Sequence, residues 1–113
     1  MALTNTAPTA ASATFTDITE IGAGGGYTAG GMTLDTVTLT ETTGTAKVTI
    51  ADEVLTASAS VGPFRYVYIY NDTATSPADA GVCYFDYGSA ITLANGESFT
   101  IDFDATNGLW QLV

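Results

Sequence analysis

The stretch that decides the fold is Phe64-Arg65-Tyr66-Val67-Tyr68-Ile69-Tyr70. Aromatic and β-branched side chains fill it, and these residue types favour the pleated backbone of a β-strand. All of them except Arg65 are apolar or aromatic, so both faces of the strand are apolar. Such a strand is typical of the middle of a sheet that is covered on both sides, or of an interface. We therefore expect residues 64–70 to form a central strand.

The segment that follows predicts a partner for this strand. Residues 71–80 contain Asn71-Asp72 and Ser76-Pro77, which are turn-forming pairs, so we expect an exposed loop. Residues 81–87 are again rich in aromatic side chains and would return along the central strand. The two tyrosine-rich strands should pair.

Alternating apolar and polar residues predict further strands on both sides of this pair. Residues 33–51 predict a hairpin around the turn Glu41-Thr42-Thr43-Gly44, with its apolar side chains on one face. Residues 91–104 predict a second hairpin around Ala94-Asn95-Gly96-Glu97, because Asn-Gly readily adopts positive φ. Residues 109–113 predict a last strand.

Two weaker patterns, over residues 15–21 and 54–58, bring the total to about eight or nine short strands. Turn signals every ~8–12 residues are typical of sandwiches and not of alternating β/α units. The predicted class is all-β, an antiparallel β-sandwich or jelly-roll-like fold. We expect a flexible N-terminal arm over residues 1–14 and a single domain over residues 15–113.

Residues 22–31 hold six glycines around Tyr27, which predicts a loop. A phosphate-binding loop would open a helix and carry a lysine, whereas an alternating β-branched segment follows here. Close backbone packing or a tight turn around Tyr27 is the favoured interpretation.

Composition excludes several functions. The formal charge is −10, with Lys47 and Arg65 as the only cations, which argues against binding nucleic acid or an anionic membrane surface. Histidine is absent and Cys83 is the only cysteine, so the chain has no His-based acid or base and no Cys/His zinc site. We expect no enzyme activity, no catalytic residues and no cofactor. Cys83 is interpreted as a buried small hydrophobe.

The acidic residues offer a metal hypothesis that we weigh against a solvated surface. Asp102 and Asp104 are two positions apart in a predicted strand and would approach Asp86 or Asp52. Calcium takes six to eight oxygen ligands, normally gathered by a loop, so a solvated acidic face is favoured and no metal site is predicted.

The aromatic residues of the central strand and Trp110 have three open interpretations, which are core packing, a protein interface and a platform for a ligand such as a sugar. Arg65 is the stronger candidate for a functional contact. A cation that is costly to bury alone should meet an acid of its own chain or a carboxylate on a neighbouring subunit.

Two segments carry a resemblance to a known group of proteins. They are Ile21-Gly22-Ala23-Gly24-Gly25-Gly26-Tyr27-Thr28-Ala29-Gly30-Gly31-Met32-Thr33-Leu34 and Arg65-Tyr66-Val67-Tyr68-Ile69-Tyr70-Asn71-Asp72. With a C-terminal pattern over residues 91–112, the chain resembles small virion proteins of tailed bacteriophages, of the capsid decoration or cement type. The likeness covers most of the chain after Thr14.

The resemblance implies a structural protein of the virion, located on the capsid surface and assembled in the host cytoplasm. Its partners would be the major capsid protein and copies of itself, as a homotrimer. The alternative is a β-sandwich module of the tail or fibre that binds host glycans. The expected interface residues are Arg65, Tyr27, Gly30, Gly31, Tyr66, Tyr68, Tyr70 and Trp110.

Overall fold

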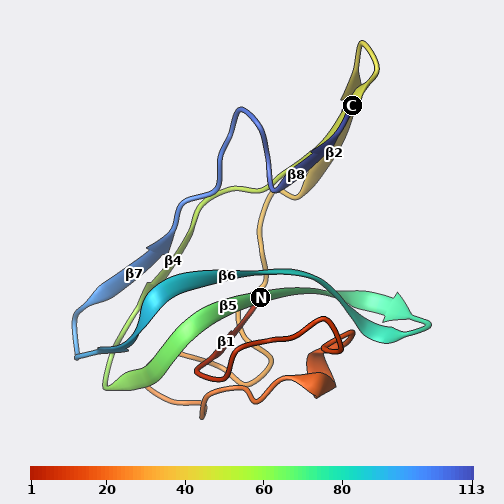
Figure 1. Cartoon of the computed structure of the whole chain (residues 1–113). Coiled ribbons are helices and arrows are strands. Elements are labelled where there is room, and N and C mark those ends of the chain that lie inside the picture. The colour runs from red at the N-terminus through yellow and green to blue at the C-terminus, as the bar shows by residue number, and fades with distance from the viewer. The chain divides into compact units, whose positions relative to one another are not determined.

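A computed structural model describes all 113 residues, and the fold is all-β with antiparallel sheets, as predicted. Its elements are β1 (Ala2–Thr4), the short 3-10 turn η1 (Phe15–Asp17), β2 (Thr38–Thr42), β3 (Thr45–Thr49), β4 (Glu53–Thr56), β5 (Val61–Thr75), β6 (Ala78–Leu93), β7 (Ser98–Ile101) and β8 (Trp110–Leu112) (Figure 1). No helix in the chain is long and apolar enough to cross a membrane.

The backbone groups into two compact units where the sequence predicted one domain. Unit 1 comprises residues 1–32 and 56–97, and unit 2 comprises residues 33–55 and 98–113. Unit 1 holds a sheet of order β1-β5-β6, and unit 2 holds a sheet of order β2-β3-β8. The strands β4 and β7 form a separate pair.

The longest strands of unit 1, β5 and β6, pair along most of their length (Figure 1). Tyr68 pairs with Tyr84 and Val67 with Phe85, so the two tyrosine-rich strands are neighbours, and β5 is the central strand, as predicted. The expected loop over residues 71–80 is wrong. The ladder continues to the pair Thr75 and Ala78, because turn-forming side chains on an exposed hairpin do not prevent its backbone from pairing.

The expected flexible arm over residues 1–14 is also wrong. Ala2, Leu3 and Thr4 form β1, pair with Tyr66–Tyr68 of β5 and are fully buried. The Thr4 hydroxyl donates to the Thr19 carbonyl at 2.5 Å, and the Met1 amino group donates to the Met32 carbonyl at 2.6 Å. A strand of three residues is too short to show a period in the sequence, but β1 adds to the sheet beside the strand richest in aromatic residues.

The predicted strand over residues 15–21 is replaced by the 3-10 turn η1. The Asp17 carboxylate accepts hydrogen bonds from the Thr14 backbone N–H and hydroxyl at 2.8 and 2.9 Å. The cap gives the Thr14 N–H and hydroxyl an acceptor within the turn, whereas in a strand these donors would need a partner on a neighbouring strand. The Thr-x-x-Asp spacing was therefore the better signal than the alternation.

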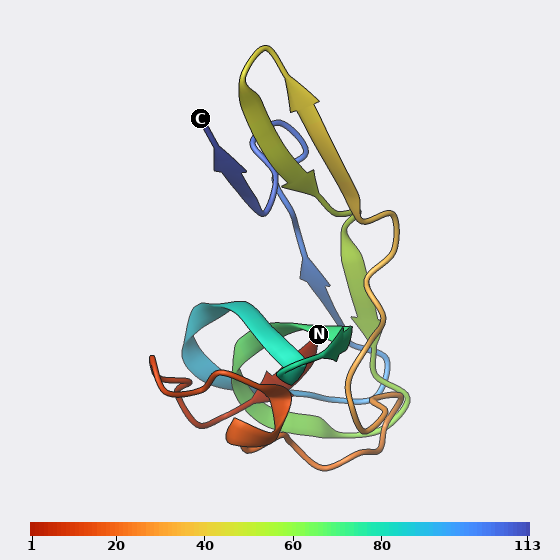
Figure 2. The same cartoon turned by 90° about the vertical axis from the view of Figure 1, so that its right-hand side faces the viewer.

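Unit 2 contains the predicted first hairpin, now β2 and β3, and β8 adds to the outer edge of β3 (Figure 2). The second predicted hairpin is wrong. The turn forms, since Glu97 N–H donates to the Ala94 carbonyl at 3.0 Å, but the strands on its two sides have different partners. Residues 91–93 pair with β5, whereas β7 pairs with β4.

Candidate interaction surfaces

The expected interface residue Tyr27 lies inside unit 1 and is 2% exposed. Its hydroxyl donates to Glu20 Oε1 at 2.7 Å and accepts the Leu3 backbone N–H at 2.9 Å. Burial, and then the hydrogen bond to Glu20, raise the pKa of the Tyr27 phenol far above its ordinary value. Tyr27 therefore fixes the glycine-rich loop to β1 and offers no surface to a partner.

Gly30 and Gly31, which follow Tyr27 in the same loop, also make contacts inside unit 1. Gly30 N–H donates to Glu20 Oε1 at 2.8 Å, and the Gly30 carbonyl accepts the Tyr70 hydroxyl at 2.6 Å. Gly31 has a φ of +87°, and a Cβ there would collide with the Met1 backbone. The loop over residues 22–31, which the sequence predicted, is close backbone packing.

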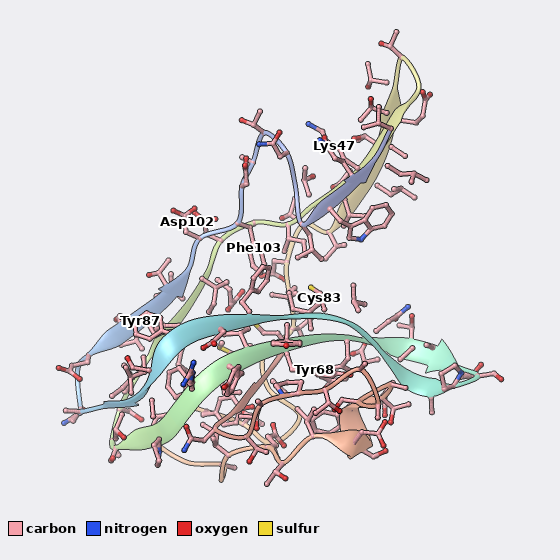
Figure 3. The ribbon with its side chains drawn as sticks, viewed as in Figure 1. Lys47, Tyr68, Cys83, Tyr87, Asp102 and Phe103 are labelled. Atoms are coloured by element: carbon pink, nitrogen blue, oxygen red, sulfur yellow. The ribbon has the colours of Figure 1, made fainter.

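Tyr68 and Tyr70 of β5 lie on the same side of the strand, with ring centroids 6.5 Å apart, but differ in burial. Tyr68 is 2% exposed and donates to the Ser12 carbonyl at 2.8 Å. Tyr70 is half-buried and stacks on Phe15, with ring centroids 4.7 Å apart. Figure 3 shows Tyr68 and Cys83 on opposite faces of the β5–β6 ladder. Core packing is the interpretation that fits Tyr68, and the interface hypothesis does not hold for Tyr27 or Tyr68.

Arg65 meets an acid of its own chain, one of the two partners expected for it. Its Nε donates to Asp86 Oδ1 at 2.7 Å and its Nη2 donates to Asp86 Oδ2 at 2.8 Å, which is a bidentate pair. The guanidinium also lies over the Tyr66 ring, 5.2 Å from its centroid. The Arg65 hydrogen bonds hold the pKa of the Asp86 carboxyl at about 2.

Asp86 sits where the ladder between β5 and β6 is irregular. Tyr66 pairs with Asp86 but Phe64 pairs with Ile91, so β6 contains extra residues between these two positions. Asp86 Oδ1 accepts the Gly88 backbone N–H at 2.7 Å and so braces this bulge. The Asp86 carboxylate thus holds both the bulge and the Arg65 guanidinium, so Arg65 has a defined position on the surface.

Tyr84 completes a small surface beside this ion pair. Its ring meets the Tyr66 ring edge to face, with centroids 6.1 Å apart, and Tyr84 is 46% exposed. We call the set Arg65, Tyr66, Tyr84 and Asp86 the arginine–tyrosine patch. Tyrosine and arginine are the residue types enriched at the centres of protein interfaces.

The second surface is one face of the sheet β2-β3-β8, and the sequence did not indicate its exposure. Cross-strand pairing aligns Leu39 with Val48 and Trp110 in one row, and Glu41 with Ala46 and Leu112 in the next. Directly opposed residues share a face, so the apolar side chains of both rows lie together. We call Leu39, Ala46, Val48, Trp110 and Leu112 the apolar sheet face.

This face is open to solvent in the chain. Leu39 is 68% exposed, Leu112 69% and Trp110 45%, although the alternation of their strands predicted a half-buried sheet. The opposite face is polar, with threonines and Lys47, whose Nζ donates to the Thr106 carbonyl at 2.8 Å (Figure 3). In its row Trp110 lies opposite Val48, and Ala46 and Leu112 follow on the same face, so these neighbours offer no hydrogen-bonding side chain, whereas a sugar platform needs polar groups around its aromatic ring.

Asp52, Asp86 and Asp104, three of the four carboxylates considered for calcium, have separate partners. Asp52 Oδ1 accepts the Phe103 backbone N–H at 2.9 Å, and Asp104 accepts the N–H groups of Thr106 and Asn107 at 2.7 and 2.9 Å. Asp86 is held by Arg65. No group of three or more acidic, histidine or cysteine side chains comes together as metal ligands.

Burial raises the pKa of the half-buried Cys83 thiol.

No family model, no curated protein and no solved structure matches this chain.

Proposed function

We propose that the chain is a structural virion protein, a decoration or cement subunit that binds the outer surface of a phage capsid and stabilises it. The observation that carries the proposal is the apolar sheet face, on which Leu39 and Leu112 are each about two-thirds exposed. Large apolar side chains that are this exposed and lie side by side make the face a candidate site of protein contact. A subunit whose function is to bind its neighbours needs such surfaces.

The arginine–tyrosine patch supports the same function. Arg65 is held by two hydrogen bonds and a ring contact, so it loses little side-chain entropy when a partner covers it. Tyr66 and Tyr84 supply rigid aromatic area beside it. We assign this patch to the capsid surface. The resemblance of residues 21–34 and 65–72 to phage virion proteins gives the proposal its biological setting.

Binding to isolated capsids tests the role directly. Heads of the phage that encodes the chain, prepared without this protein, are mixed with the purified full chain and sedimented. We expect saturable co-sedimentation in many copies per head, and greater resistance of the loaded heads to heat. Absence of co-sedimentation, or a copy number of only a few per native particle, would overturn the proposal.

Variants locate the contact on the patch. Tyr84→Ala should weaken binding to heads at least about tenfold, which is the effect typical of an aromatic residue near the centre of an interface. Val54→Ala is the matched control, because Val54 is also about half exposed but lies on β4, outside both surfaces. Equal binding of the two variants would remove the patch from the contact.

A further inference from the structure

We propose that Asn95 is a site of spontaneous deamidation, at which the side-chain amide is converted to a carboxylate through a succinimide ring. The dipeptide Asn-Gly occurs twice in the chain, at residues 95–96 and 107–108. The structure holds the two asparagines differently, so that Asn95 reacts and Asn107 is protected. The inference concerns the chemistry of the chain by itself and does not depend on the virion role.

The reaction requires only the chain and water. The Gly96 nitrogen loses its proton and attacks Cγ of Asn95, the bond from Cγ to Nδ2 breaks, and that nitrogen leaves as ammonia. Water then opens the ring at one of its two carbonyl carbons, which gives aspartate or isoaspartate with no oxidation or reduction. Glycine favours the first step, because it has no side chain and its backbone adopts many conformations.

The turn around Asn95 leaves the reacting groups accessible. The Asn95 side chain is exposed and forms no hydrogen bond within the chain. Nothing lies within 4 Å of a Cβ built at Gly96, so a succinimide ring has room there. The Gly96 N–H donates to the Ala57 carbonyl at 2.7 Å, and the attack therefore waits until this bond opens. Hydrogen bonds at exposed turns open by local fluctuation without global unfolding.

Asn107 has the same following residue, but Asp104 holds both of its reacting groups. Its Nδ2 donates to Asp104 Oδ2 at 2.7 Å, and its backbone N–H donates to Asp104 Oδ1 at 2.9 Å. The Gly108 N–H, which would be the attacking group, donates to the Asp104 carbonyl at 2.8 Å. A Cβ at Gly108 would collide with the Val48 backbone, so this loop is also closely packed. The amide cannot approach the Gly108 nitrogen until Asp104 releases it.

The hydrogen bond to the Asn107 amide sets the expected difference in rate. A factor of ten in rate corresponds to about 1.4 kcal/mol, which is close to the value of a hydrogen bond to a charged group. The Asn95 amide has no such bond to break. Asn107 should therefore react at least about tenfold more slowly than Asn95 in the folded chain.

Deamidation would change the turn that joins β6 to β7. In this turn Ala57 is hydrogen-bonded twice, because its carbonyl accepts the Gly96 N–H and its N–H donates to the Glu97 carbonyl at 2.8 Å. Isoaspartate at position 95 inserts a methylene group into the backbone directly before Gly96, which should displace both partners of Ala57. The product also carries an added negative charge. The turn should therefore loosen as the protein ages.

Incubation of the full chain at mildly alkaline pH, followed by peptide mass spectrometry, tests the proposal. Cleavage after Glu97 places the two asparagines on separate peptides. We expect the Asn95 peptide to convert from amide to acid, in part as isoaspartate, at least about tenfold faster than the Asn107 peptide. The rate should rise with pH, because the attack needs a deprotonated nitrogen. Equal rates, or a faster reaction at Asn107, would overturn the proposal.

The same measurement in concentrated urea separates the effect of the fold from that of the local sequence. Unfolding releases both asparagines, so their rates should become similar. A tenfold difference that persists in urea would overturn the proposal, because the local sequence would then be its cause.

Asp104→Ala tests the protection of Asn107 in the folded chain. The variant removes an exposed carboxylate, so it should keep the fold, accelerate the reaction at Asn107 about tenfold and leave the rate at Asn95 unchanged. Circular dichroism checks the fold, and the comparison in urea remains decisive if the variant does not fold. Asn95→Gln is the control, since glutamine would need a larger ring, and it should lose the modification. An unchanged rate at Asn107 in folded Asp104→Ala would overturn the proposed protection.

Discussion

The hydroxyl of Tyr27 donates a 2.7 Å hydrogen bond to the Glu20 carboxylate, and the same oxygen accepts the backbone N–H of Leu3. One phenol thus joins the glycine-rich loop, the segment before it and the buried strand β1.

Tyr27→Phe should destabilise unit 1 by about 1–3 kcal/mol, because it leaves the buried Leu3 N–H without an acceptor. Urea denaturation measures the change, and amide exchange at Leu3 should accelerate. Tyr84→Phe is the control, since Tyr84 is half exposed, and it should change stability by less than about 0.5 kcal/mol. Equal effects of the two substitutions would contradict the proposed role of the Tyr27 hydroxyl.

Gly31→Ala should destabilise the chain much more than Gly96→Ala. Both glycines belong to unit 1 and have a φ of +87°, so the backbone strain of an alanine is the same, about 1–2 kcal/mol. They differ in space, because a Cβ at Gly31 meets the Met1 backbone whereas nothing lies within 4 Å of one at Gly96. Thermal denaturation compares the two variants. Similar melting temperatures would show that β1 is not in close contact with the loop.

The Arg65–Asp86 pair should make stability depend on pH in the acid range. The folded pKa of Asp86 is about 2, below its ordinary value of 3.8, so the folded state favours the ionised carboxylate. This contribution is complete above about pH 4 and is lost as the pH falls toward 2. In Asp86→Asn, stability should depend less on pH between 4 and 2. A carboxyl carbon of Asp86 that titrates near 3.8 in NMR would contradict the prediction.

Removal of residues 2–14 should abolish the fold of unit 1, because β1 is fully buried and pairs with the central strand β5. Loss of the strand signal in circular dichroism and rapid exchange across residues 61–93 would report this. Replacing the exposed residues Ala10 and Ala11 with glycine is the control and should leave the fold intact. A stable, ordered truncation product would restore the interpretation of these residues as an arm.

The sequence predicted those elements whose own side chains decide their structure. The central strand and the first hairpin were found because apolar periodicity acts within the segment itself. Strand β1 lies in the segment expected to be a flexible arm, and the partner of β7 was also missed, since a strand's pairing depends on residues far away in the chain. The Ala94–Glu97 turn was predicted correctly, but a local turn does not determine which strands lie beside its ends.

The candidate surfaces were predicted only in part for a similar reason. Arg65 was identified because a cation in an acidic chain must have a partner, and Asp86 is that partner. In the sequence, Tyr27 and Tyr68 cannot be distinguished from the exposed Tyr84. They are buried because the N-terminal segment packs against them. The exposure of Leu39 and Leu112 has no sequence signal, because an uncovered sheet has the same alternation as a covered one.

The division of the chain into two interleaved units has a consequence for its synthesis. During synthesis β1 emerges before its partner and cannot pair until residues 66–68 have followed it. In unit 2 the hairpin of β2 and β3 can pair by itself, but its sheet is completed only by β8. At ~5–20 residues per second strand β1 remains unpaired for several seconds. Neither unit is complete until these later strands have emerged, and the net charge of −10 helps the unpaired strands to avoid aggregation in that interval.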